Sequence, residues 1–308
     1  MSLLQVELEE KKQYETDIKK TGTFLGYKLP QYWHIANGVK DRIEHYRLNR
    51  NVDSTVHPVP LRPFLPEIQS FIKFNHIDVG QELLGLLALG LELPEDALVK
   101  KFSYEEKNNA NCEFRNIYPH PKDEEIQTEG VWLKGHTDQG LLTILWSQPV
   151  SALQIRDEDG KWRWVRHVEN ALVCLHVQAT GGFRSDKPTP HFSQIVNCGD
   201  SLEMLSGDYY KSAIHRVVQP PEDQQGYNRL GVFYFGYADD DVQLEPLTES
   251  PVLQRVGFTR HAPEGKAPFM GDWRKARAAA YGTSNLQKGE EEGIEEEVVG
   301  GIRVKHYN

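Results

Sequence analysis

Hydrophobic and polar positions divide the chain into a helical front part and a longer part built of short strands. Apolar side chains recur at helical spacing over residues 66–90, and Pro66 suits the first turn of that helix. Gly80 interrupts the pattern and weakens the case for one unbroken rod. A second short helix is expected at 93–98, and the Glu- and Lys-rich residues 5–20 favour a helix at the front.

Proline and glycine mark the connections within this front part. Residues 21–30 read as a loop, and residues 31–47 as a short helical or irregular segment. Residues 51–66 hold four prolines and are expected to form an extended connector.

From about residue 111, short β-rich runs alternate with turns. The strongest hairpin signal is Asp159-Gly160, between the expected strands 152–157 and 161–168. Further strands are expected at 112–119, 141–147, 170–177, 194–200, 202–207, 212–219 and 230–237. Many short strands after a helical front half predict a mainly β fold with flanking helices, a jelly-roll or a sandwich.

These patterns suggest three parts. Residues 1–110 form the helical part, residues 111–245 the jelly-roll core, and residues 246–308 a C-terminal helix and an acidic tail. The helix is expected at 271–282, and the acidic run 289–297 is expected to be a solvated segment.

Composition is that of an ordinary globular protein. The chain has 308 residues, 39% of them apolar and 26% charged, and a net charge of -10 that argues against a nucleic-acid-binding surface. Its three cysteines, without CxxC spacing, favour reduced thiols in an intracellular protein. No signal peptide and no apolar run of about 18 residues is present, so we expect a cytoplasmic protein without a membrane partner. The oligomeric state stays open.

Four polar side chains form a candidate site. His136 and Asp138 are two apart, so on a strand both point to one face. His215 lies on a distant predicted strand, and two imidazoles with one carboxylate are the facial ligand set of non-haem Fe(II) oxygenases. Arg229 follows fourteen residues later and offers a planar fork for a carboxylate. The His-x-Asp pair alone would be a weak signal.

Longer motifs around these residues carry a resemblance to a known family. They are NIYP (116–119), GHTDQGLLTIL (135–145), LQIRDEDGKWRWV (153–165), VNCGDSLEMLSGDYYKSAIHRVV (196–218) and RLG (229–231). Together they resemble the 2-oxoglutarate/Fe(II)-dependent dioxygenase superfamily, in the isopenicillin N synthase-like branch. The resemblance runs from about residue 5 to 240, and the matching segments look most like the fungal biosynthetic members.

The resemblance implies a double-stranded β-helix and an oxidoreductase. Fe(II) would be held by the catalytic residues His136, Asp138 and His215, and the co-substrate 2-oxoglutarate by Arg229, Tyr118 and Asn116. Such enzymes use O2, release succinate and carbon dioxide, and remove hydrogen from a small molecule. The result is hydroxylation, desaturation or ring modification, often in secondary metabolism. The sequence does not identify the small molecule.

Three features depart from the family pattern. Gly231 stands where the family has Ser, so one hydrogen bond to 2-oxoglutarate, worth about 0.5–1.5 kcal/mol, is expected to be lost. Residues 176–194 look like an inserted surface loop, and its His176 and His191 are not expected to bind metal. The chain also begins late against the family, so the core is expected to lack a strand and part of its helical backing.

Two alternatives remain open at this point. One is an oxidase of the same fold that uses O2 without 2-oxoglutarate, against which Arg229 argues. The other is a truncated, non-catalytic homologue that only binds metal or partners.

Overall fold

A computed structural model describes residues 6–105, 110–165, 172–175, 194–282, 284, 286–289 and 293–307. Within these ranges, no helix has the length and apolar character that crossing a membrane requires. The expected insertion at 176–194, with His176 and His191, falls outside the described residues except for Gln194.

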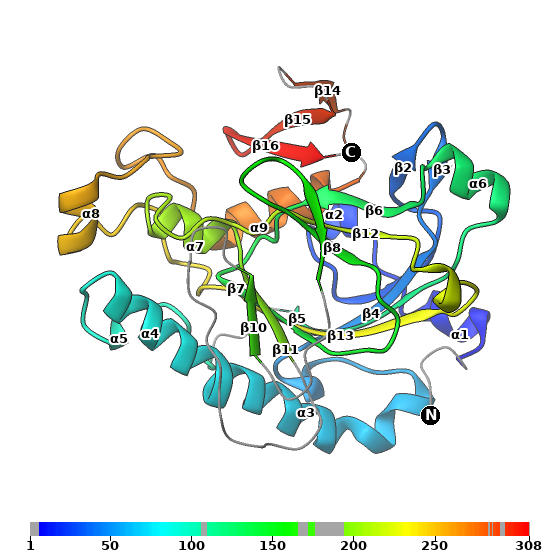
Figure 1. The fold of residues 1–308 in the computed structure, drawn as a ribbon. Helices are drawn as coiled ribbons and strands as arrows, with labels where there is room; N and C mark the ends of the chain where they lie inside the picture. Colours follow the sequence, from blue (N-terminus) through cyan, green and yellow to red (C-terminus); the bar gives the residue numbers. More distant parts are fainter. Residues whose placement is uncertain are drawn as a thin grey trace.

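Two seven-stranded sheets face each other (Figure 1). The major sheet has the order β1 (Gly26–Lys28), β4 (Ile43–Asn49), β5 (Ala110–Ile117), β13 (Arg229–Gly236), β7 (Leu142–Trp146), β11 (Gln194–Cys198) and β10 (Leu172–Leu175). The minor sheet has the order β14 (Gln287–Lys288), β15 (Ile294–Val299), β16 (Ile302–Tyr307), β6 (Val131–His136), β12 (His215–Val218), β8 (Leu153–Arg156) and β9 (Trp162–Trp164). The chain passes from β6 in one sheet to β7 in the other and back to β8, as in a jelly-roll. The predicted fold class is confirmed.

The helical rod predicted at 66–90 is present, and it covers the outer face of the major sheet (Figure 1). It consists of α3 (Leu65–Phe74), a π-helical stretch at Asn75–Gln81 and α4 (Glu82–Gly90). Gly80 lies in the π stretch, where an added Cβ would approach Phe102 to 2.9 Å. The glycine therefore marks a widened turn rather than a break, because a close-packed ring leaves no room for a side chain.

The other helices are short and sit at the ends and edges of the sheets. They are α1 (Leu8–Gln13), α2 (Ile18–Thr21), α5 (Asp96–Val99), α6 (Lys122–Gln127), α7 (Asp200–Leu205), α8 (Pro251–Val256) and α9 (Met270–Ala280). The last of these is the predicted C-terminal helix, which packs against α2 and β15. The sequence patterns had not indicated α6 and α8.

The prediction for residues 31–47 was wrong. This segment forms β2 (His34–Ala36), β3 (Val39–Lys40) and most of β4. All seven side chains of β4 are buried, so the strand lacks the alternation of buried and exposed positions that marks a half-exposed strand. Its charged residues looked like those of a surface segment, but they form ion pairs inside the protein. The loop predicted at 21–30 likewise contains the short strand β1.

Two further predictions were wrong nearer the C-terminus. The strand expected at 202–207 is mostly helix, because α7 begins directly after Gly199 and places Leu202 and Leu205 in the core. The acidic run 289–297 is not simply solvated, because its second half forms β15. There Glu297 is only 8% exposed and accepts a hydrogen bond of 2.8 Å from His306 Nε2.

The sheets also draw on residues outside 111–245. Strand β4 comes from the front part and pairs with β5, while β16 comes from the C-terminal part and pairs with β6. The division at 110 and 245 stays a prediction, but the sheets themselves cross both boundaries.

Candidate metal and co-substrate site

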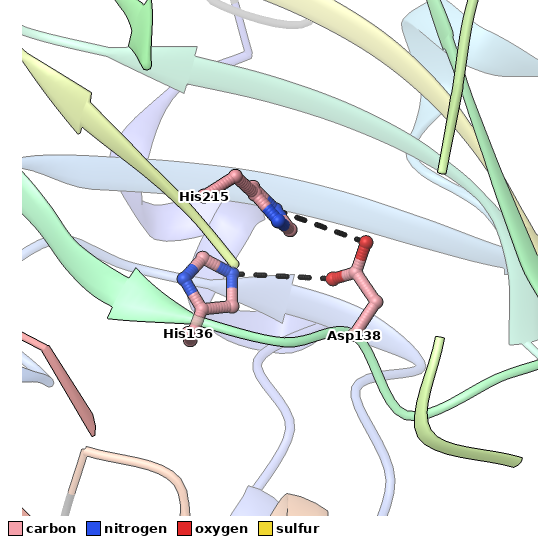
Figure 2. Close-up of side chains that lie close together, drawn as sticks. All are labelled: His136, Asp138 and His215. Atoms are coloured by element: carbon pink, nitrogen blue, oxygen red, sulfur yellow. Dashed lines mark ion pairs between the residues drawn. The ribbon is translucent and has the colours of Figure 1, made fainter. Parts of the chain in front are cut away.

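The structure brings His136, Asp138 and His215 together (Figure 2). His136 ends β6 and His215 begins β12, and the two residues are direct partners in the antiparallel ladder. Asp138 Oδ1 lies 3.9 Å from His136 Nε2, and Asp138 Oδ2 lies 3.8 Å from His215 Nε2. Three ligand atoms bound to one ion at about 2.1 Å would lie about 3–4 Å apart, so this set could hold a metal ion.

In both imidazoles Nε2 faces the Asp138 carboxylate, and Nδ1 points to a backbone carbonyl. The Nδ1–H of His136 donates to the carbonyl of Lys134 at 2.8 Å, and that of His215 to the carbonyl of Ala213 at 2.9 Å. These bonds fix the tautomer and leave each Nε2 lone pair available. Burial lowers the pKa of His136 to about 3, so its ring is neutral, as a metal ligand requires.

The carboxylate of Asp138 is held by a neighbouring strand. Asn197 on β11 donates from Nδ2 to Asp138 Oδ2 at 2.9 Å. Burial raises the pKa of Asp138, but the His215 and His136 rings and this hydrogen bond together lower it below its ordinary value. The group is therefore ionised at neutral pH.

Close backbone packing fixes the segment that follows Asp138. A Cβ on Gly199 would lie 2.4 Å from the carbonyl oxygen of Gly140 and 2.8 Å from that of Asp138. The amide of Asp200 also donates to the Asp138 carbonyl at 2.7 Å. Only glycine fits at this crossing, which holds the Asp138 backbone in place.

We predict that Asn197→Ala weakens metal binding about 10–100-fold, because a partner that orients a ligating carboxylate typically contributes that much. Calorimetric titration of the apoprotein with Co(II) measures the effect. Gln148→Ala, on the connection after β7, is the matched control and should leave the affinity unchanged. Equal affinities in the Asn197 variant and the native protein would contradict the role given to Asn197.

Arg229 is buried on the inner face of the major sheet. It is 2% exposed and lines a cavity of about 30 Å³ together with Asp138 and His215. It forms no ion pair or hydrogen bond with any residue that the structure describes, and its buried Nε has no acceptor. Burial, followed by the nearby Arg115 charge, lowers its pKa to about 10, so the group is still cationic at pH 7. A buried, uncompensated guanidinium fits an anionic ligand.

Asn116 and Tyr118 do not lie with the triad and Arg229 in this structure, and their contact with 2-oxoglutarate stays a prediction. Arg229 pairs with Ile117 across β13 and β5, so successive residues of β5 alternate and Asn116 points to the outer face. Asn116 there lines a separate cavity of about 460 Å³ next to α3. The Tyr118 hydroxyl donates to Glu44 Oε2 at 3.2 Å. The NIYP motif is present, but its Asn116 and Tyr118 side chains face away from the triad.

Gly231 lies between Arg229 and the aromatic side chains of β13. A Cβ at this position would meet Phe233 Cε2 at 2.5 Å, and the Phe233 ring stacks on Phe235 with centroids 5.7 Å apart. The ring thus occupies the place where a serine hydroxyl would stand. Arg115 is the direct ladder partner of Gly231, and its guanidinium lies 4.7 Å from the Phe233 ring centroid.

Comparison with known proteins agrees with this arrangement. The sequence model of the 2OG-Fe(II) oxygenase superfamily matches residues 172–235. Jasmonate-induced oxygenase 3 of Arabidopsis thaliana is 34% identical over 174 residues, which are 56% of this chain and 40% of that protein. The 2-oxoglutarate-dependent dioxygenase frbH of Dothideomycetidae sp. is 28% identical over 178 residues, 58% of this chain and 47% of that protein. In these segments the chain is similar to members of the 2OG-Fe(II) oxygenase superfamily.

The fold of this chain is also similar to that of a solved structure. The crystal structure of a full-length Neurospora crassa protein in complex with alpha-KG matches with a TM-score of 0.65 and 20% identity, over 90% of this chain and 79% of that one. At that identity the likeness shows the fold alone. The chain spans about half the length of the curated relatives it matches.

The donor set fits the groups that the superfamily name implies. Two imidazole nitrogens and one carboxylate oxygen suit Fe(II), and a triad confined to one side leaves coordination positions open. The unpartnered guanidinium of Arg229 fits a dicarboxylate whose other end reaches the metal.

A second set of charged residues, which the sequence patterns had not singled out, lies on the same inner face. Glu113 is fully buried and accepts from Arg47 Nε at 2.8 Å and from Arg115 Nε at 2.6 Å. We call Arg47, Glu113 and Arg115 the inner ion cluster. Burial raises the pKa of Glu113, but the two guanidinium groups outweigh it and hold the pKa well below its usual range. Alternating charged residues at 113 and 115 within a buried strand were the available signal.

Replacing Glu113 with Gln should destabilise the protein by about 3–5 kcal/mol at pH 7, because it leaves two buried guanidinium groups without their carboxylate. The native carboxylate has a depressed pKa, so its stabilisation is complete above the unfolded value of about 4.3 and is lost as the pH falls through lower values. Urea unfolding at pH 7 and pH 4 should therefore show a smaller pH dependence in the Gln variant. Parallel pH profiles would contradict this charge assignment.

Proposed function

We propose that this protein is an Fe(II)- and 2-oxoglutarate-dependent oxygenase that oxidises a small molecule. His136, Asp138 and His215 would hold Fe(II), and Arg229 would pair with the distal carboxylate of 2-oxoglutarate. The single observation that carries the proposal is the buried, unpartnered Arg229 in the cavity that Asp138 and His215 also line. Bound iron would supply the activation of O2. For a hydroxylation, one oxygen atom enters succinate and the other enters the product, and carbon dioxide leaves.

The surrounding residues support this chemistry in three ways. The Lys134 and Ala213 carbonyls orient the two imidazoles, and Asn197 orients the carboxylate. Leucine, isoleucine, valine and phenylalanine side chains form about half of the cavity lining and exclude water; they are Leu133, Leu145, Leu153, Ile195, Val217, Phe233 and Phe235. Because the cavity has a volume of only about 30 Å³, the co-substrate has to displace some of these side chains as it enters.

The proposal is tested by adding Fe(II) and 2-oxoglutarate to the protein without oxygen. A weak visible charge-transfer band is expected, and its absence from a folded sample would overturn the proposal. Aerobic turnover with a panel of small molecules should then release succinate. A non-catalytic homologue would bind both ligands and release none.

The alternative of an oxidase that works without 2-oxoglutarate has two observations in its favour. Among the relatives are 1-aminocyclopropane-1-carboxylate oxidases of Cucumis melo and Malus domestica, 30% and 28% identical, and Gly231 removes one hydrogen bond to the co-substrate. Arg229 argues against it, since an oxidase would leave this buried charge uncompensated. Product formation that is independent of added 2-oxoglutarate would favour the oxidase.

The proposal extends to a role in fungal secondary metabolism and to a cytoplasmic location. Two fungal relatives named as 2-oxoglutarate-dependent dioxygenases, 28% identical each, support the first part. Expression of the tagged full chain in a filamentous fungus, followed by fractionation, tests the location.

A further inference from the structure

The inner ion cluster contains one more positive charge than it can compensate. Arg47 donates from Nε and Nη2 to Glu113 and from Nη1 to the Tyr237 hydroxyl, so its donors are largely used. Arg115 donates to the same carboxylate only through Nε. Its terminal nitrogens form no hydrogen bond with any residue in the described part of the chain. One carboxylate thus serves two buried guanidinium groups.

Binding of iron and 2-oxoglutarate would not remove this excess. The distal carboxylate would neutralise Arg229, and the proximal carboxylate with Asp138 would balance a divalent ion. Arg277, another buried guanidinium, already has Asp200 at 3.4 Å and Glu297 at 3.9 Å. Arg115 then shares the single carboxylate of Glu113 with Arg47, and its terminal nitrogens are free to bind a further anion.

Arg115 is placed to meet such an anion beside the metal site. It lines the small cavity that holds Asp138, His215 and Arg229, and also a second cavity on the His136 side. Its side chain is 11% exposed and its guanidinium lies 4.7 Å from the Phe233 ring centroid. A guanidinium that stacks on a ring can still donate from its edge to a carboxylate.

The second cavity is bounded by aromatic rings. Phe24 and Trp33 meet edge to face at 6.3 Å, Trp33 and Tyr281 at 5.0 Å, and Tyr281 lies 5.5 Å from His136. The buried Trp33 Nε1 has no acceptor among the described residues. The cavity measures about 40 Å³, room for about one to three waters, so a ring has to move aside for any larger guest.

We propose that the primary substrate is a small cyclic or aromatic acid, whose single carboxylate pairs with Arg115 and whose ring lies against Phe24, Trp33 and Tyr281. This inference rests on the proposed function and names the substrate class of the same site. Arg115 is then a binding residue for the primary substrate and does not hold the co-substrate.

Binding without oxygen tests the substrate class. The full chain is loaded with Fe(II) and 2-oxoglutarate and titrated with phenylacetate, 1-naphthaleneacetate and cyclohexylacetate, and with their primary amides. Calorimetry and the change in the charge-transfer band report binding. At least one acid should bind ten or more times more tightly than its amide. If no acid is preferred, the inference is overturned, and if 2-oxoglutarate does not bind, the proposed function falls and this inference with it.

Two variants distinguish the role proposed for Arg115, binding the primary substrate, from that of Arg229, binding 2-oxoglutarate. Arg115→Met should remove the preference for the acid and leave the affinity for 2-oxoglutarate within about threefold, whereas Arg229→Met should weaken 2-oxoglutarate. Glu113 keeps Arg47 as a partner in the Arg115→Met protein, and Arg115→Lys, which keeps the charge, should retain part of the preference. If Arg115→Met weakens 2-oxoglutarate as much as Arg229→Met does, or if the acid preference survives it, the inference is overturned.

Discussion

Replacing Asp138 with alanine is expected to abolish metal-dependent activity while the protein stays folded. The carboxylate faces both Nε2 atoms, at 3.9 and 3.8 Å, so its loss leaves two neutral imidazoles without an anionic ligand. Loss of a partner that merely orients a ligand costs about 10–100-fold in metal affinity, so loss of the ligand itself should cost more than about 100-fold. Titration with Co(II) and succinate release measure the two effects.

The matched control is Asp123→Ala, which removes an exposed carboxylate from α6. That variant should bind metal and turn over as the native chain does. Thermal unfolding without metal should give similar midpoints for both variants. If the Asp138 variant still released succinate at more than about one tenth of the native rate, Asp138 would not be a required ligand.

The clustering of His136, Asp138 and His215 could be predicted from the sequence because its geometry is largely local. His136 and Asp138 are two residues apart at a strand end, and the ladder that joins β6 to β12 places His215 opposite His136. The planar fork of Arg229 then indicated a residue for a carboxylate, and the resemblance assigned 2-oxoglutarate to it. These positions follow once the strands that carry the residues have been recognised in the sequence.

Positions that depend on which face of a strand a residue occupies were not predictable in the same way. Asn116 and Arg115 are neighbours, and a shift of one residue decides which of them meets the metal site. The strand β4 was missed for a related reason, since ion pairs bury its charged side chains on both faces, Glu44 with Lys11 and Arg47 with Glu113. In both cases partners far along the chain decided the environment.

The acidic run at the C-terminus shows that amino-acid composition alone does not predict whether a segment is buried. Glu295 and Glu297 both lie on β15, where Glu295 pairs with Lys134 and Glu297 with His306. A run of acidic residues is usually solvated, and the sequence alone does not show which residues would pair with it. Here the partners lie on β6 and β16, so pairing with other strands turns the second half of the run into part of the minor sheet.

Replacing Arg229 with methionine should have opposite effects on the apoprotein and on the complex with 2-oxoglutarate. In the apoprotein the guanidinium is 2% exposed and has no partner among the described residues, so an apolar chain of similar length should leave stability unchanged or raise it. In the complex the same change leaves a buried carboxylate unpaired, at a cost of about 3–5 kcal/mol. The dissociation constant should therefore rise by about 10²–10³-fold.

Thermal unfolding of the apoprotein and anaerobic titration with 2-oxoglutarate measure the two effects in one preparation. Arg255→Met is the control, because Arg255 is exposed and pairs with Glu92 on the surface. It should change neither quantity beyond the small effect of a surface ion pair. A strongly destabilised Arg229→Met apoprotein would mean that Arg229 holds the fold together through a partner of its own. An unchanged affinity for 2-oxoglutarate would mean that the co-substrate carboxylate is bound elsewhere, with Arg115 as the next guanidinium to replace.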